Sequence, residues 1–200
     1  MTDPRLGLKG LRWTGDLSLE DAAVLAYLAR NHHRILEFGA GGSTQIFAQV
    51  TPGQVWSYET DSAWQTTTES RLQTLAKTVT WLGPGDPLPD HVDLIFVDGR
   101  DDLRRDWAIK AWPTLASGGV MAFHDTRRFQ DFQNLAWVAQ LFYTEINHIL
   151  VNTAAQTGNH SNISLIYKRP RLDYVNWNHT EGKPQWAYGD LDPTRPLWEA

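Results

Sequence analysis

The feature that most constrains the fold is an alternation of short apolar runs with longer segments of helical periodicity, repeated five times along the chain. Such runs, bounded by turn residues, are typical of buried strands, and the segments between them are long enough for helices. The expected strands cover residues 34–38, 55–59, 78–82, 94–97, 120–125, 147–152 and 162–168. The expected helices cover residues 18–31, 43–50, 61–77, 101–115 and 128–144, the fourth ended by Gly118 and Gly119. This order predicts an α/β fold.

The last two expected strands decide the form of the sheet. They are joined without room for a helix, so they should form an antiparallel pair, whereas strands separated by helices run parallel. The sequence therefore predicts a single doubly wound, mostly parallel sheet of seven strands with a C-terminal antiparallel hairpin.

Residues 169–200 follow this domain of residues 1–168, and they are rich in Pro, Trp, Asn and Asp. We expect them to form an extended tail packed on the domain.

Composition excludes several kinds of protein. The 200 residues suffice for one stable core, and the absence of cysteine excludes disulfides, thiolate chemistry and cysteine-ligated metals. A net charge of -5 disfavours nucleic acid as a partner. The sequence shows neither a signal-peptide pattern nor an apolar stretch of membrane-spanning length, so we expect a soluble, cytoplasmic protein with no membrane partner. Whether it forms a homo-oligomer stays open.

The stretch ILEFGAGGSTQIFAQV, residues 35–50, joins a strand to a helix through glycines and is the first candidate ligand site. Doubly wound sheets bind ligands at the carboxyl ends of their strands. The candidate contacts here are Glu37, Gly39, Ala40, Gly41 and Ser43. The dinucleotide fingerprint would need a third glycine where this chain has Thr44, and Glu37 would repel a pyrophosphate. A carboxylate suits a ligand with an amino group or a sulfonium, such as S-adenosylmethionine; a tight turn without a ligand is the alternative.

Two further acidic residues follow strands. Glu59 ends the second strand, at about the interval after the glycines where an acidic residue grips ribose hydroxyls. We therefore expect Glu59 to bind a ribose, although a lone acid after a strand is also an ordinary loop charge. Asp86 follows the third strand in GPGD. Its carboxylate would accept a hydrogen bond from an adenine amino group, or it belongs to a plain turn.

Four stretches, in this order, resemble the class I S-adenosylmethionine-dependent methyltransferases: LEFGAGGST, YET with Glu59, DLIFVDG and LASGGVMAFHD. The resemblance covers roughly residues 18–168, and VDG followed by GGV and HD is similar to the small-molecule O-methyltransferases. It implies a Rossmann-like methyltransferase fold, S-adenosylmethionine as the cofactor and a small-molecule acceptor.

Methyl transfer requires a positioned nucleophile and the removal of its proton. Asp98 and Asp125 end neighbouring strands, and with His124 they are the candidate catalytic residues; Asp98 is also a candidate cofactor contact. In the cation-dependent O-methyltransferases, which the chain resembles, the matching positions carry two aspartates with an asparagine next and bind a divalent metal. Here Thr126 replaces that asparagine, and the family's catalytic lysine has no counterpart in DGRDD.

Both a metal site and structural roles therefore remain open for these residues. Asp98 and Asp125 are candidate ligands of a divalent cation such as Mg²⁺, with His124 beside them. Alternatively, Asp125 caps the following helix and Asp98 orders a turn, or Asp98 is a metal-free base; for His124 the alternative is a core histidine bonded to backbone.

Arginines gather after the fourth and fifth strands. Arg100, Arg127 and Arg128 are the candidate substrate contacts, because guanidinium groups suit the carboxylate or phosphate of an anionic acceptor. We expect Arg104 and Arg105 to lie on a solvated helix face, paired with nearby acids.

The expected function is methyl transfer from S-adenosylmethionine to an oxygen of a small polar or anionic acceptor. One rival is a nucleotide- or NAD-dependent oxidoreductase of the same fold. Another is a catalytically silent partner subunit, which the tail tryptophans Trp177, Trp186 and Trp198 would suit.

Overall fold

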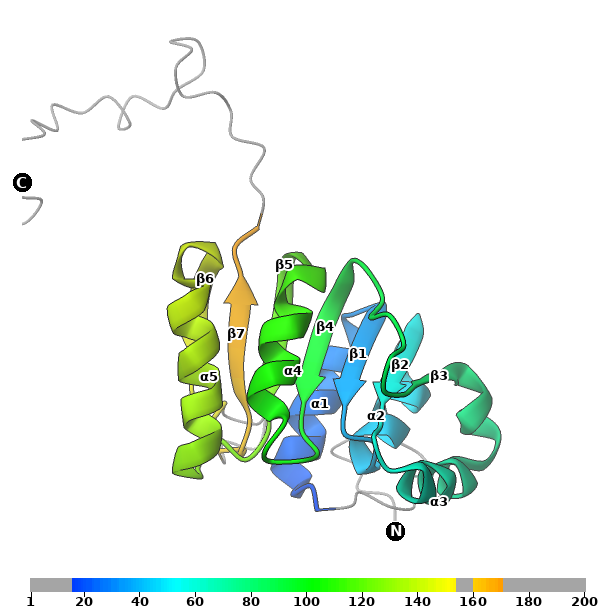
Figure 1. Cartoon of the computed structure of the whole chain (residues 1–200). Coiled ribbons are helices and arrows are strands. Elements are labelled where there is room, and N and C mark those ends of the chain that lie inside the picture. The colour runs from blue at the N-terminus through cyan, green and yellow to red at the C-terminus, as the bar shows by residue number, and fades with distance from the viewer. Residues whose placement is uncertain (1–15, 154–159, 171–200) are drawn as a thin grey trace, which may run out of the picture. The chain divides into compact units, whose positions relative to one another are not determined.

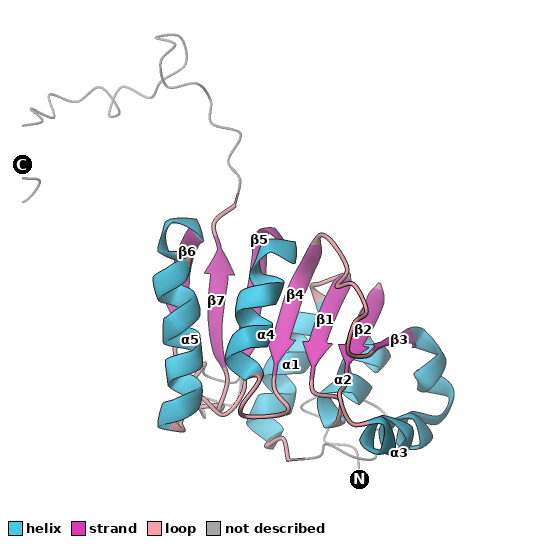
Figure 2. Cartoon of the chain, in the orientation of Figure 1, coloured by secondary structure: helices cyan, strands magenta, loops and turns pink. Residues whose placement is uncertain are grey.

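The computed structural model describes residues 16–153 and 160–170, which belong to one compact unit within residues 1–170. Helices cover both sides of a central sheet, and a helix precedes each of the first five strands except the fourth, which follows the third through a loop (Figures 1 and 2). Residues 171–200 form a second unit outside the described residues, so the predicted tail stays a prediction. None of the described helices has the length and apolar character that crossing a bilayer requires.

The sheet has seven strands in the order β3-β2-β1-β4-β5-β7-β6. The strands are β1 (Arg34–Phe38), β2 (Gln54–Tyr58), β3 (Val79–Leu82), β4 (Val92–Val97), β5 (Leu115–Phe123), β6 (Ile146–Leu150) and β7 (Ser164–Lys168). Strands β1 to β5 pair in parallel, and β7 lies antiparallel between β5 and β6. The predicted sheet is confirmed. The strand order reverses between β1 and β4, which is where doubly wound sheets bind ligands.

Among the described residues, one α-helix precedes the first strand and four lie between strands. They are α1 (Leu19–Arg30), α2 (Gly42–Val50), α3 (Ser62–Leu72), α4 (Arg104–Ala111) and α5 (Phe129–Leu141). Helix α1 begins with a capping box, in which Ser18 Oγ accepts from the Asp21 N–H and Asp21 Oδ2 accepts from the Ser18 N–H, both at 3.1 Å. Helices α3 and α4 are shorter than predicted because 3₁₀ turns over Gln73–Thr78 and Trp112–Thr114 follow them.

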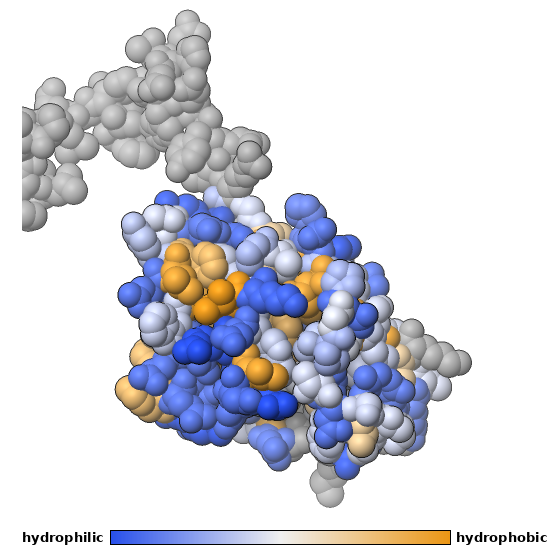
Figure 3. All heavy atoms as spheres, viewed as in Figure 1, coloured by the Kyte–Doolittle hydropathy of each residue, from blue (hydrophilic) through white to orange (hydrophobic). Residues whose placement is uncertain are grey.

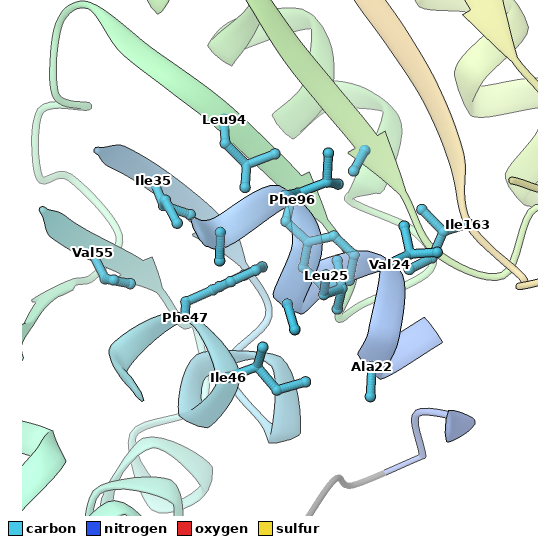
Figure 4. Close-up of a cluster of buried hydrophobic side chains, with 14 of the residues drawn as sticks. Ala22, Val24, Leu25, Ile35, Ile46, Phe47, Val55, Leu94, Phe96 and Ile163 are labelled. Atoms are coloured by element: carbon cyan, nitrogen blue, oxygen red, sulfur yellow. The ribbon is translucent and has the colours of Figure 1, made fainter. Parts of the chain in front are cut away.

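Each face of the sheet buries its own apolar core, because successive side chains of a strand point to opposite faces. On one face, Phe47 of α2 meets Phe96 of β4 edge-on at 5.7 Å, beside Leu25 of α1 (Figure 4). On the other face, Phe38 of β1 stacks on Trp107 of α4 at 5.4 Å. With both faces covered, the carboxyl edge of the sheet is left for a ligand.

The predicted role of Gly118 and Gly119 as the end of a helix is wrong. The helix has already ended, and both glycines lie inside β5. The pairing of β4 with β5 shifts register between Val92 and Leu94, so β5 bulges there. A Cβ on Gly119 would lie 3.0 Å from the carbonyl oxygens of Ala116 and Asp93, which explains a glycine at the bulge.

Helix α5 leaves part of its apolar surface uncovered. Phe129, Trp137 and Leu141 are exposed, and Figure 3 shows apolar side chains among hydrophilic ones on the side of the sheet that carries α4 and α5. Single exposed apolar side chains are common on the surfaces of monomeric proteins.

Candidate functional site

A cavity of about 640 Å³ opens at the carboxyl ends of β1, β2, β4 and β5. This volume lies within the range of small-molecule and cofactor sites, ~300–1,000 Å³. Residues directly after each of these strands line it, together with the segment before α1. The lining comprises residues 16–17, 39–43, 59, 61, 64, 71, 98–100, 104, 124–125 and 128. The cavity therefore lies where the strand-end rule places a ligand.

The glycine turn, residues 39–43, forms one wall of this cavity. Gly39 has a φ of 89°, and a Cβ there would lie 2.5 Å from the Cα of Gly99 in the loop after β4. Only glycine fits this backbone conformation and this close approach. At Gly41 a Cβ would meet nothing within 4 Å. The turn thus presents bare backbone to the cavity, as the sequence predicts.

Glu37 does not face the cavity, contrary to our expectation of a direct ligand contact. Its carboxylate is fully buried behind the turn and accepts hydrogen bonds from Ser43 Oγ, from Thr44 Oγ1 at 2.6 Å and from Ser57 Oγ at 2.7 Å. Burial raises the pKa of Glu37 from 4.5 to about 7, although the three hydroxyl donors lower it. The residue therefore braces the turn from within, and the hydroxyl of Ser43 is also engaged there.

Glu59 lines the cavity directly beside the glycine turn. Its Oε2 accepts from the Ala40 N–H at 3.1 Å, and its Oε1 accepts from the N–H groups of Thr60 and Asp61 at 2.7 and 2.9 Å. A carboxylate offers about four lone-pair sites, so one site on Oε2 remains for a ligand hydroxyl. These bonds fix the carboxylate at the position predicted for ribose binding.

Asp86 is not part of the cavity lining, so its contact with adenine stays a prediction. Its Oδ2 accepts from the Gly83 N–H at 2.8 Å, as in the alternative of a plain turn. Trp64 at the start of α3 lines the cavity instead. Its Nε1 donates to the Ala40 carbonyl at 2.7 Å, which ties the indole to the glycine turn.

A second wall is an arginine cluster, formed by Arg104, Arg128, Asp98, Asp125 and Asp131. Arg104 is only 5% exposed, so the expected solvated position is wrong. Its Nη2 donates to Asp98 Oδ1 at 2.7 Å, and its Nη1 donates to Asp131 Oδ1 at 2.9 Å and to Asp125 Oδ2 at 3.2 Å. The cluster joins the loops after β4 and β5 to the first turns of α4 and α5.

The nitrogens of His124 face aspartate side chains. The structural alternative for this residue, a core histidine bonded to backbone, did not include these partners. Its Nδ1 is 3.3 Å from Asp98 Oδ2 and 3.6 Å from Asp125 Oδ1, and its Nε2 is 3.5 Å from Asp21 Oδ2. Burial acts to lower the pKa of His124, but Asp21 and Asp98 outweigh it and raise the pKa to about 10. The ring is therefore a cation at neutral pH and a poor base.

Asp98 and Asp125 are both held by charged or polar neighbours. Burial acts to raise the pKa of Asp98, but His124 and Arg104 outweigh it and hold the pKa below its usual range. Asp125 has a φ of 59°, a conformation that non-glycine residues seldom adopt. Its Oδ1 accepts from Asn162 Nδ2 at 2.9 Å, and its Oδ2 accepts from Arg128 Nη2 at 2.7 Å.

The other arginines divide between the cavity and the surface. Arg100 lines the cavity and forms an exposed ion pair with Asp102, and Arg128 lines it within the arginine cluster. Arg127 is not part of the lining; its Nη2 donates to the His160 carbonyl at 2.8 Å. Arg105 is exposed beside Asp106, as expected. Of the three predicted substrate contacts, the structure brings Arg100 and Arg128 to the cavity and leaves Arg127 outside.

One donor from each of Asp98, His124 and Asp125 lies within 4.8 Å of the others, which is compatible with a bound ion. In the structure, however, guanidinium groups contact both carboxylates. The contributions of Asp21, Asp131 and Asn162 to this site were not predicted from the sequence. The place of Asp131 and Arg104 near the cavity could have been predicted from their positions in the sequence. Each lies in the first turn of a helix that begins at the carboxyl edge of the sheet.

Solved structures share this architecture. The O-methyltransferase TomG from Streptomyces achromogenes, involved in tomaymycin synthesis and solved with SAM, is 18% identical, with a TM-score of 0.62, over 84% of this chain and 91% of that chain. An O-methyltransferase from Bacillus cereus, solved with SAH, is 18% identical, with a TM-score of 0.61, over 84% and 92%. No family model and no curated protein matches the sequence. These likenesses confirm the predicted Rossmann-like methyltransferase fold.

Proposed function

We propose that this chain is an S-adenosylmethionine-dependent methyltransferase that methylates an oxygen of a small polar or anionic acceptor. The two structural neighbours described above were solved with that cofactor or its demethylated product, and both are O-methyltransferases. The cavity of this chain occupies the carboxyl edge of the same fold. A cytoplasmic location and a homo-oligomeric state stay predictions from the sequence.

The position of Glu59 beside the glycine turn is the observation that carries this proposal. Three backbone N–H groups fix its carboxylate, and one lone-pair site is left for a ribose hydroxyl. Gly41 leaves open space where a side chain would otherwise project. A nucleoside held at Glu59 would thus extend its amino-acid end along bare backbone.

The charges next to the glycine turn favour a sulfonium over a pyrophosphate. Glu59 and Asp61 follow β2 and line the cavity, and the turn itself carries no arginine or lysine. Thr44, which replaces the third glycine of the dinucleotide fingerprint, has its hydroxyl engaged with Glu37 at 2.6 Å. Carboxylates at this place stabilise a cation and repel phosphate, which disfavours an NAD-dependent oxidoreductase.

The arginine cluster and His124 would act on the acceptor. When bound, S-adenosylmethionine supplies an electrophilic methyl group on a sulfonium. The chain must then hold an acceptor oxygen in line with that methyl group. His124 is a cation, and the pKa of Asp98 lies below its usual range, so neither residue is a strong base. We therefore assign Asp98, His124 and Asp125 to orienting an acceptor oxygen that arrives already ionised, with the His124 cation stabilising it.

Calorimetric titration with S-adenosylhomocysteine tests the cofactor site. Glu59→Ala removes one charge-assisted hydrogen bond, so the affinity should fall about tenfold. Asp86→Ala is the matched control, because this acid lies outside the cavity lining, and it should leave the affinity unchanged. Equal affinity in wild type and Glu59→Ala, or tighter binding of NAD, would refute the proposal.

A second experiment separates an enzyme from a silent partner subunit. The protein is incubated with methyl-labelled cofactor and a small-molecule extract, and the products are separated by chromatography. An active methyltransferase transfers label to an acceptor. Cofactor binding without any labelled product would favour the silent subunit.

A further inference from the structure

The carboxylates of the candidate metal site already have partners. Asp98 Oδ1 accepts from Arg104 at 2.7 Å, and Asp98 Oδ2 lies 3.3 Å from His124. Asp125 Oδ2 accepts from Arg104 at 3.2 Å and from Arg128 at 2.7 Å. Asp125 Oδ1 accepts from Asn162 at 2.9 Å. Each of the four oxygens therefore faces a nitrogen atom. An ion could reach the carboxylates only by displacing these groups.

Arg104 is fixed so that it does not move aside easily. A guanidinium has five N–H donors. Its Nε and Nη2 donate to the Gly99 carbonyl at 3.1 and 3.0 Å, and the remaining donors reach Asp98, Asp125 and Asp131. The side chain is 6% exposed. Breaking these bonds would leave a buried guanidinium unpaired, which is strongly unfavourable.

A divalent ion bound to these oxygens would also lie close to Arg104 and would be repelled by it. The guanidinium itself places a positive charge on the same two carboxylates and holds them in fixed directions. The residues therefore do not fit a metal ion in this arrangement, although the donor atoms are close enough together to bind one.

We propose that Arg104 takes the place of a divalent cation in this cavity: its guanidinium orients Asp98 and Asp125 and keeps metal ions out. Arg104 is then a positioning residue, and the chemistry at this edge of the sheet does not depend on a metal. The inference deepens the proposed methyl transfer. Its test requires neither cofactor nor acceptor, so its failure would be distinct from failure of that function.

Manganese binding to the wild-type protein is the first test, with the free ion followed by electron paramagnetic resonance. We expect no saturable site in the micromolar range. A micromolar site that is lost in both Asp98→Asn and Asp125→Asn would overturn the proposal, because the ion would then share these carboxylates with Arg104.

Arg104→Met tests the guanidinium directly. It frees Asp98 Oδ1 and removes one of the two guanidinium groups on Asp125 Oδ2, so we expect Mn²⁺ affinity to rise at least about tenfold. Arg105→Met is the matched control, since it removes the same charge from the exposed neighbouring position, and it should bind Mn²⁺ as weakly as wild type. A folded Arg104→Met protein without any gain in affinity would refute the role of Arg104.

A second measurement keeps the proposal testable if Arg104→Met does not fold. The Nε–H resonance of Arg104 is followed by nitrogen-15 NMR in the wild-type protein during titration with millimolar Mg²⁺. An unchanged resonance supports a guanidinium that stays in place. A saturable shift of this resonance, absent from that of Arg105, would overturn the proposal.

Discussion

The two walls of the cavity are built from different parts of the polypeptide. The glycine-turn wall uses backbone: bare glycine at Gly41, and N–H groups that hold Glu59. The arginine-cluster wall uses charged side chains from two loops and two helices, with Arg104 at its centre. The first wall depends on local conformation and the second on ion pairs between distant segments. Substitutions should therefore affect the two walls in different ways.

The largest effect is expected at Arg104. Arg104→Ala leaves Asp98, Asp125 and Asp131 without their shared cation, and the free energy of unfolding should fall by about 3–5 kcal/mol. Urea denaturation measures this change. Arg105→Ala, at an exposed site, should show no measurable change. Equal effects of the two substitutions would mean that the cluster does not stabilise its wall.

Glu37 lies behind the glycine-turn wall and should make the stability of the protein depend on pH. Its pKa rises from 4.5 to about 7 on folding, so the folded state binds the proton more tightly than the unfolded state. This contribution to stability is therefore present below pH 4.5 and is lost as pH rises to about 7, by an amount on the order of 3 kcal/mol.

Glu37→Gln mimics the protonated form and should remove this dependence. The difference between the unfolding free energies of Glu37→Gln and wild type should increase between pH 4.5 and pH 7 and then stay constant. Thermal unfolding at a series of pH values measures it. A constant difference over that range would show that Glu37 does not titrate there.

Gly39 and Gly41 separate the stability of the turn from its capacity to bind. Gly39→Ala places a Cβ 2.5 Å from Gly99 Cα at a φ of 89°, so it should destabilise the fold by roughly 2–3 kcal/mol. Gly41→Ala meets no atom within 4 Å, so stability should be kept while S-adenosylhomocysteine binds more weakly. Calorimetric titration and urea denaturation of both variants check this. Unchanged binding by Gly41→Ala would mean that the cofactor lies elsewhere.

The smallest effect is expected for the acceptor. Arg128→Gln removes a half-exposed guanidinium from the cavity and should raise the Michaelis constant of an anionic acceptor roughly three- to tenfold, with cofactor affinity unchanged. Arg127→Gln, outside the lining, is the control and should keep wild-type kinetics. The assay uses the acceptor identified by methyl labelling. A neutral acceptor, or equal kinetics for both variants, would contradict an anionic substrate.

The contrast between the walls also explains what the sequence could predict. The positions of the glycine turn and Glu59 follow from neighbouring residues and from the strand-end rule, so they could be predicted from the sequence. Glu37 was misplaced because a strand residue points to one of two faces, and the hydroxyls of Ser57 and Thr44 that bury it belong to other elements. For Asp86, the local sequence GPGD fits both an adenine contact and a plain turn, so it could not distinguish them.

The arginine cluster could not be predicted from residues that are neighbours in the sequence. The sequence places Arg104 next to several acids, which is equally typical of a solvated helix face. Its partner Asp131 lies 27 residues further along, and their contact exists only because α4 and α5 pack on the same face of the sheet. His124 was a similar case, since its partner Asp21 comes from α1.

Asp21 and Asn162 also set the order in which the site can be completed during synthesis. The Asn162 N–H donates to Asp21 Oδ1 at 2.6 Å across a separation of 141 residues, and the Asn162 side chain donates to Asp125. A nascent chain that has emerged only through β5 already contains the glycine turn and Glu59. It still lacks the residue that links Asp21 in α1 to Asp125, which anchors the arginine cluster. One wall of the cavity is thus able to form early on the ribosome, whereas the other waits for the end of the domain.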